Sequence, residues 1–190
     1  MQSSNTRRGL VMMVLCAVLL ALAASALGAR GKVKGPGNGT GPANAKVVIK
    51  GTETFKRNAY LKVSMHFVAG TLTVRSGGTV TLTNTTDEPH TFSIVKPSQL
   101  PRTIKQIQEC GVCGEIAKSH GLNPEGPPGP PPIPLVNVGP VGFDEPGDSV
   151  IIGPKGHGAP VTFKVTAPAG TTLNFMCAIH PWMQGRILVK

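Results

Sequence analysis

Short segments in which apolar and β-branched residues alternate with polar ones recur along most of this chain. The clearest pair covers 71–74 (TLTV) and 79–83 (TVTLT), and the four residues between them, 75–78 (RSGG), contain two glycines that suit a tight turn. Alternation with a period of two is typical of half-buried β-strands. Both segments are therefore predicted to be strands that a tight turn joins.

Further segments of the same kind predict an all-β fold. Turn-forming sequences such as 85–89 and 168–170 separate them. Short strands in such number, divided by turns, indicate a β-sandwich or a β-barrel. The additional predicted strands are 46–50, 61–68, 90–95, 149–152, 161–165, 171–176 and 186–189.

Residues 97–147 break this pattern and are predicted to form a partly helical, Pro-rich insertion. A helix over 101–121 is expected, because Pro101 suits a first turn and Gly121 a helix end. The apolar residues of such a helix would share one face, and a stiff, extended stretch, 126–134 (GPPGPPPIP), would follow. The face would consist of Ile104, Ile107, Cys110, Cys113 and Ala117.

The N-terminal segment has the features of an export signal. Arg7 and Arg8 precede an apolar run that ends in small residues, so 1–29 is interpreted as a cleaved signal peptide. The run is also close to the ~18 residues at which membrane spanning begins, which leaves an uncleaved anchor as the alternative. Residues 30–44 are expected to be a flexible linker and 45–190 the folded domain. The expected location is secreted or periplasmic.

The net charge of the chain indicates which kinds of partner it could bind. The chain has 19 basic and 9 acidic residues, a formal net charge of +10. Such a charge could attract a redox partner with an acidic docking surface or an anionic surface, while most of the basic residues are interpreted as scattered charge that keeps the protein soluble. Nucleic acid is not expected, because export separates the chain from most of it and no basic–aromatic motif is present.

The segment 177–183 (CAIHPWM) carries the most informative chemistry. It places a thiolate, an imidazole and a thioether, from Cys177, His180 and Met183, at a spacing of three residues each. His90, at the start of a predicted strand, offers a second imidazole. One thiolate, two imidazoles and a weak thioether suit copper, whereas a structural zinc site needs a fourth good donor.

The ligand segment, followed by Gly185, resembles the copper-binding loop of cupredoxins, and its short form most resembles that of amicyanin within the amicyanin/plastocyanin family. The stretch 77–84 (GGTVTLTN) also resembles the cupredoxin strand that precedes the first histidine ligand. The resemblance covers about residues 61–95 and 148–190. It implies a Greek-key β-sandwich with one type 1 copper ion. The implied ligands are His90, Cys177, His180 and Met183.

The resemblance also implies a function: single-electron transfer with a redox protein partner outside the cytoplasm. An enzyme is not expected, because the five histidines include no His-x-His pair for a catalytic copper centre. Copper storage, delivery or sensing is the alternative. The sequence departs from the cupredoxin pattern at Thr91, where several relatives have Asn. The hydrogen bonding of the Cys177 thiolate is therefore expected to differ.

Cys110 and Cys113 form a C-x-x-C pair inside the insertion. Export favours a local disulfide between them. A redox-active dithiol and a second metal site with His120 or His157 are the alternatives, in that order, and no thioredoxin-like context supports the former.

Overall fold

The computed structural model describes residues 39–123, 126 and 129–190, which belong to one compact unit over 36–190. The expected signal or anchor at 1–29 and the first part of the expected linker, 30–38, lie outside the described residues. Among the residues that the structure describes, no helix is long and apolar enough to cross a membrane.

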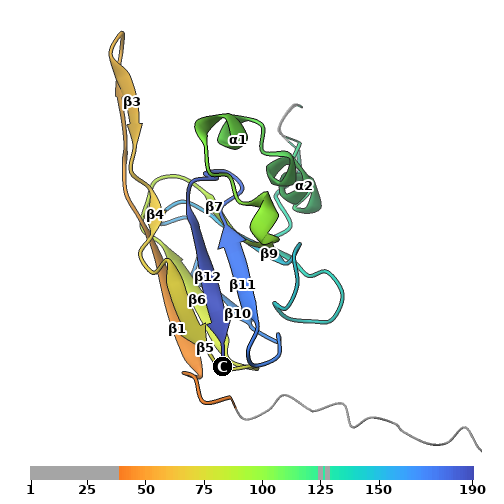
Figure 1. The fold of residues 1–190 in the computed structure, drawn as a ribbon. Coiled ribbons are helices and arrows are strands. Elements are labelled where there is room, and N and C mark those ends of the chain that lie inside the picture. Colours follow the sequence, from red (N-terminus) through yellow and green to blue (C-terminus); the bar gives the residue numbers. More distant parts are fainter. Residues whose placement is uncertain (1–38, 124–125, 127–128) are drawn as a thin grey trace, which may run out of the picture. The chain divides into compact units, whose positions relative to one another are not determined.

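Two β-sheets make up the body of the molecule (Figure 1). Segments with period-two alternation form their strands, because alternate side chains can then face a shared core. The first sheet has the order β10 (Val161–Lys164), β6 (Thr79–Asn84), β1 (Asn44–Lys50), β4 (His66–Phe67). The second has the order β5 (Thr71–Val74), β12 (Gln184–Val189), β11 (Thr172–Met176), β7 (His90–Val95), β9 (Ser149–Ile152), β8 (Leu135–Val136).

The two sheets share one apolar core, which confirms the predicted β-sandwich. Val47 and Leu82 of the first sheet and Phe175 and Ile187 of the second are all fully buried within it. Aromatic rings fill its centre: Phe92 stacks on Phe175 at a centroid distance of 4.0 Å. Burial of large rings supplies much of the hydrophobic stabilisation of a small sandwich.

Strand β7 is central to the second sheet and carries His90 at its first position. It pairs antiparallel with β11 on one side and with β9 on the other. All six of its residues are buried. The sheet therefore holds His90 rigidly beside the end of β11, although the two strands are far apart in the sequence.

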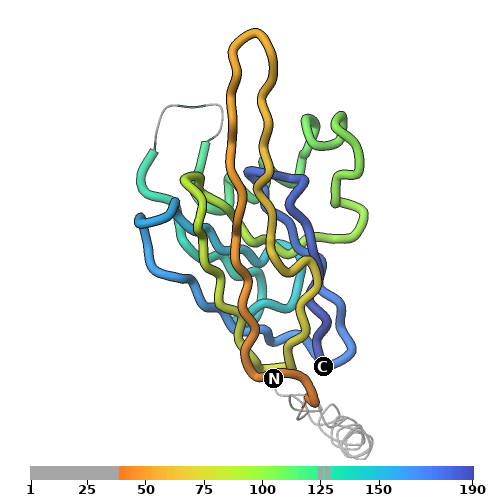
Figure 2. The backbone as a smooth tube through the Cα atoms, turned by 90° about the vertical axis from the view of Figure 1, so that its left-hand side faces the viewer, coloured from red at the N-terminus to blue at the C-terminus, as the bar shows by residue number. Residues whose placement is uncertain are grey.

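The prediction of one strand over 61–68 is wrong. The segment forms two strands, β3 (Tyr60–Val63) and β4, because β3 pairs with a strand absent from the prediction, β2 (Glu53–Lys56), while β4 pairs with β1. The β2–β3 hairpin extends beyond the sandwich (Figure 2). Its exposed positions include the large apolar side chains of Phe55, Tyr60 and Leu61.

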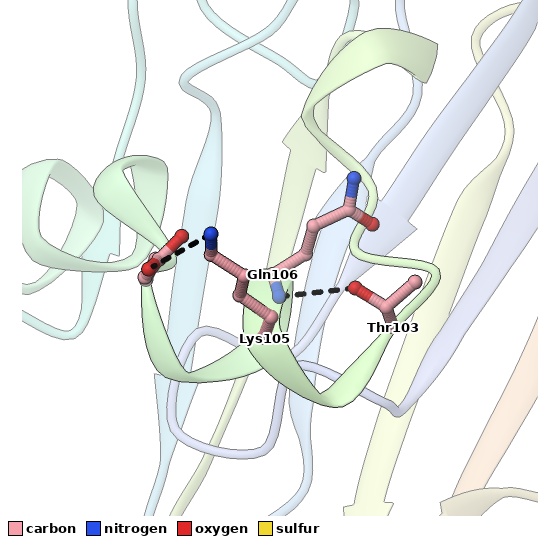
Figure 3. Close-up of polar contacts among 4 residues, drawn as sticks. Thr103, Lys105 and Gln106 are labelled. Carbon is pink, nitrogen blue, oxygen red and sulfur yellow. Dashed lines mark hydrogen bonds and ion pairs between the residues drawn. The ribbon is translucent and has the colours of Figure 1, made fainter.

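The insertion contains helix, as predicted, but the single helix over 101–121 is wrong. A 3₁₀ turn (Pro97–Gln99) precedes two short helices, α1 (Ile104–Gln108) and α2 (Gly111–Ser119). Thr103 caps α1 by accepting a hydrogen bond from the Gln106 amide, and Lys105 pairs with Glu109 at 4.0 Å (Figure 3).

The break between the helices lies at Cys110, whose backbone is not helical (φ −65°, ψ 88°) and which forms a disulfide with Cys113. The break resets the helical phase, so the predicted apolar face does not form. Ile104 is 74% exposed, whereas Ile116 is buried. Ile116 packs with Val95 and Met176, and this contact joins the insertion to the strand that precedes Cys177.

Candidate metal centre

The four predicted ligands lie at the end of the sandwich where β11 ends and β12 begins. Cys177 directly follows β11, His180 lies in the turn, and Met183 directly precedes β12. Two backbone hydrogen bonds close this loop: the Cys177 amide donates to the Met183 carbonyl (3.0 Å) and the Met183 amide to that of His180 (2.8 Å). The loop is thus fixed by its own backbone as well as by the sheet.

His90, Cys177 and His180 converge on one point. One donor atom from each lies within 4.8 Å of the other two. The Cys177 Sγ is 3.7 Å from the His90 Nδ1 and 3.8 Å from the His180 Nδ1, and the two nitrogens are 3.0 Å apart. The structure therefore brings together three of the four predicted residues in a group that could hold one metal ion.

The Cys177 sulfur is buried and surrounded by amide donors. The Thr91 amide lies 3.3 Å from Sγ and the His180 amide 3.4 Å. Burial raises the pKa of Cys177, and these backbone hydrogen bonds oppose that rise. A buried thiolate with neutral imidazoles beside it lacks a positive charge, which a bound metal cation supplies.

His90 is held in one orientation by Thr86. Its Nε2 lies 2.8 Å from the Thr86 hydroxyl, which in turn donates to the Asn84 Oδ1 at 2.9 Å. The hydroxyl proton is engaged with Asn84, so the Nε2–H of His90 is the donor and Nδ1 keeps its lone pair toward Cys177. Such support is typical of histidines that bind metals. Burial, followed by the neighbouring His180, lowers the pKa of His90 to about 4.

His180 is the donor nearest to the surface. It is 8% exposed, and its neighbours Ile179 and Trp182 are 39% and 40% exposed. The Trp182 ring meets the His180 ring edge-on at 5.2 Å, and the Trp182 indole donates to the Met65 carbonyl, just after the β2–β3 hairpin. Burial lowers the pKa of His180, while Glu88 and Glu53 raise it less.

Met183 lies in the same core cluster as Cys177 and is 2% exposed. Its backbone closes the ligand loop, as described above. Its role as the axial ligand stays a prediction. Gly185 is required for space: a Cβ there would lie 2.4 Å from the Phe175 ring and 2.7 Å from the Gly70 carbonyl oxygen.

The other cysteines and histidines that the structure describes do not join this centre. Cys110 and Cys113 are bonded to each other, which supports the disulfide interpretation. His66 and His157 are exposed. His120 is fully buried, but its ring contacts the Ile133 carbonyl oxygen and the Ser149 hydroxyl instead of a cysteine.

The sequence did not reveal Thr86 and Asn84 as supporting residues. Their signal was weak: Asn84 ends β6 and Thr86 lies in the turn before His90, where asparagine and threonine are expected for local reasons. Thr91 was noted only as a departure. In the structure it supplies an amide to the Cys177 sulfur, and its hydroxyl accepts a hydrogen bond from the Ala178 amide at 2.7 Å.

Comparison with known proteins gives structural neighbours only. No family model matches the chain, and no curated protein sequence matches it. Auracyanin A, described as a blue copper protein from Chloroflexus aurantiacus, is 22% identical, with 79% of this chain and 100% of that one covered and a TM-score of 0.42.

Two other neighbours carry related descriptions. A purple cupredoxin from Nitrosopumilus maritimus is 14% identical, with 77% of this chain and 99% of that one covered and a TM-score of 0.39. Amicyanin from Paracoccus versutus is 13% identical, with 77% and 81% covered and a TM-score of 0.37.

Proposed function

We propose that this protein binds one copper ion in a type 1 site and carries single electrons between redox partners outside the cytoplasm. The observation that supports this most is the convergence of a buried cysteine sulfur and two imidazole Nδ1 atoms within 4.8 Å. His90, Cys177 and His180 would hold the ion, and Met183 would approach from the axial side. When bound, copper supplies a one-electron couple.

The donor set fits copper better than zinc. Among the described residues, the group contains three donors of the His, Cys, Asp and Glu classes. A structural zinc site is usually closed by a fourth such donor, whereas a thioether completes an electron-transfer copper site.

The protein's own contribution is rigidity and exclusion of water. Strands β7 and β11 fix His90 and Cys177, and Thr86 fixes the orientation of the His90 ring. Fully buried Phe92 and Phe175 lie in the same core cluster as Cys177. A donor set that cannot rearrange favours rapid electron transfer, because little reorganisation accompanies the change in oxidation state.

The His180 edge is the proposed route for electrons. It reaches the surface between Ile179 and Trp182, which offer an apolar contact for a partner. The exposed Lys56, Arg57 and Lys62 of the β2–β3 hairpin favour a partner with an acidic docking surface. We expect the rate of electron transfer to such a partner to fall as ionic strength rises.

Residence outside the cytoplasm is supported by the Cys110–Cys113 disulfide, which is favoured in oxidising compartments, and by the signal-like sequence at 1–29. Both an exported soluble form and a form anchored through an uncleaved N-terminal segment are compatible with this proposal.

The decisive experiment is addition of Cu(II) to the purified protein. An intense thiolate-to-copper absorption band should appear, vanish on reduction and be absent in Cys177→Ser. A Cys110→Ser/Cys113→Ser double variant is the matched control and should keep the band. Reversible one-electron voltammetry supports a carrier. Rapid loss of copper to a mild chelator would instead favour delivery or storage.

A further inference from the structure

A chain of buried polar side chains links the helical insertion to the Cys177 sulfur. It begins at His120, at the end of α2, whose Nε2 lies 2.7 Å from the Ser149 hydroxyl. Ser149 lies 2.7 Å from the Ser93 hydroxyl, and Ser93 lies 3.0 Å from that of Thr91. All four residues are at most 2% exposed, so their polar groups bond to protein atoms rather than to bulk water.

The chain ends at the proposed metal ligand. The Thr91 hydroxyl makes a side-chain hydrogen bond that lowers the pKa of Cys177, in addition to the bond from the Thr91 amide. The same hydroxyl accepts from the Ala178 amide and, in the orientation that the structure shows, from the Ser93 hydroxyl, so its own proton points to Cys177.

The number of protons shared along this series of hydrogen-bonded side chains decides how its hydroxyl groups are oriented. Four contacts lead one after another from His120 through Ser149, Ser93 and Thr91 to Cys177. Each of these contacts needs one proton to be a hydrogen bond. The three hydroxyl groups supply three. The fourth must come from the His120 Nε2. The His120 Nδ1 faces the Ile133 carbonyl oxygen, which can only accept, so Nδ1 always carries a proton. Nε2 is therefore protonated only when the ring is charged.

The two charge states of His120 orient the hydroxyl groups in opposite directions. A charged ring donates to Ser149, Ser149 to Ser93, Ser93 to Thr91, and Thr91 to the Cys177 sulfur. A neutral ring accepts from Ser149, and Ser93 and Thr91 then turn toward the ring. In that state the sulfur loses its hydroxyl donor and keeps only its amide donors.

We propose that His120 is a positioning residue that decides, through Ser149, Ser93 and Thr91, whether a hydroxyl group donates to the Cys177 sulfur. The inference rests on the proposed copper-binding function. Hydrogen bonding around a metal-bound cysteine sulfur tunes the reduction potential. A donor withdraws electron density from the thiolate, so the reduced state is favoured when His120 is charged.

The surroundings of His120 lower its pKa below the ordinary value for histidine. Burial lowers its pKa from 6.5, and the hydrogen bond to Ile133 opposes this less strongly. The charged groups on the surrounding segments are Glu115 and Lys118 on α2 and Asp148 beside Ser149. The first two are exposed, and the Asp148 carboxylate accepts from the Val138, Asp144 and Glu145 amides. At the other end of the chain, His90 and His180 face the Cys177 sulfur.

The test is the reduction potential of the copper-loaded protein as a function of pH, measured beside the ¹⁵N chemical shifts of His120 in the Cu(I) form. We expect the potential to rise as pH falls through the His120 titration. A tenfold difference in proton affinity between the two oxidation states corresponds to about 59 mV for one electron. The energy of the thiolate-to-copper band should shift over the same pH range.

Three variants test the proposal. Two of them should shift the reduction potential in opposite directions, which a general structural role would not produce. Ser93→Ala removes the alternative acceptor for Thr91, so the potential at pH 7 should rise to the acidic value. His120→Gln removes the titrating ring; its amide can offer Ser149 either a donor or an acceptor, so this variant tests the loss of the pH dependence and not its sign. Thr91→Val removes the hydroxyl donor, so the potential should stay at or below the alkaline value. The potentials of all three should lose the pH dependence that is due to His120.

The matched control is Ser76→Ala, which deletes a buried hydroxyl that has no hydrogen-bond partner and lies outside the chain. It should titrate like the wild type, including any contribution of His90 and His180. The inference is overturned if Ser93→Ala and the wild type show the same pH dependence while His120 titrates. Absence of the copper band in every variant would instead refute the proposed function.

Discussion

The Nδ1 atoms of His90 and His180 lie 3.0 Å apart, although the residues are separated by 90 positions in the sequence. Two charged imidazoles at that distance would repel each other strongly. Both lone pairs therefore face a shared point together with the Cys177 sulfur, which is the arrangement that a metal ion requires of neutral histidines.

The first prediction concerns metal-free protein at acidic pH. His90 has a pKa of about 4 in the folded protein, below the 6.5 of an exposed histidine. Between these values the unfolded chain binds more protons, so stability is complete above pH 6.5 and declines as pH falls toward 4. His120 and His180, whose pKa values are also lowered by burial, add to the loss. Urea unfolding midpoints across this range would measure it: the decline should be smaller in His90→Gln than in the wild type, and an equal decline would contradict the role of His90.

The second prediction concerns Thr86. Thr86→Val removes the partner of the His90 Nε2 while preserving shape, so metal affinity should fall by roughly 10–100-fold. Thr85→Val is the control, since the neighbouring Thr85 hydroxyl donates to the Ile49 carbonyl and not to the centre. Competition with a calibrated chelator gives the affinities. Equal affinities for the two variants would contradict the role of Thr86.

The third prediction concerns Met183. Met183→Leu conserves volume in a site that is 2% exposed, so the stability cost should stay below about 1.5 kcal/mol. Loss of an axial thioether should raise the reduction potential while the visible band persists, because a weak donor to the oxidised ion is removed. Voltammetry of the loaded variant checks this. A potential identical to that of the wild type would show that Met183 serves only the core.

The fourth prediction concerns the disulfide. The Cys110→Ser/Cys113→Ser variant opens a very short loop, for which the chain-entropy relation gives a loss of about 2 kcal/mol. Denaturant unfolding measures that loss. Copper binding should persist because neither sulfur belongs to the centre. A change in copper stoichiometry would revive the alternative of a second metal site in the insertion.

The strands that the sequence predicted best are those bounded on both sides by clear turn or loop residues. Segments 71–74, 79–83 and 90–95 match β5, β6 and β7 closely. The error at 61–68 arose because continuity of apolar residues cannot reveal a change of pairing partner at Ser64 and Met65.

In the helical insertion, too, the apolar pattern did not reveal where one element ends and the next begins. The spacing of Ile104, Ile107 and Cys110 suggested one continuous face, but the non-helical backbone at Cys110 interrupts it. Helical periodicity gives a face only within an unbroken helix, and a local cross-link over three residues is not visible as a change in apolar pattern.

The ligand candidates were predictable because metal chemistry restricts residue types at short spacing. The supporting hydroxyl groups were not, since serine and threonine occur for many reasons in strands and turns. Thr91, Ser93 and Ser149 become a connected group only when β7 and β9 pair side by side. Their relation is a property of the sheet register rather than of any local motif.

The short spacing of the ligands in the loop affects the order in which the chain folds and binds a metal ion. Cys177 and His180 are three residues apart, so a chain that has not yet folded already offers part of the cage. His90, 87 positions upstream of Cys177, joins only when β7 docks. Copper bound early by Cys177 and His180 would therefore favour docking of β7, which brings His90 to the ion. Any affinity of the unfolded chain for copper would reduce the stabilisation that copper gives to the folded protein.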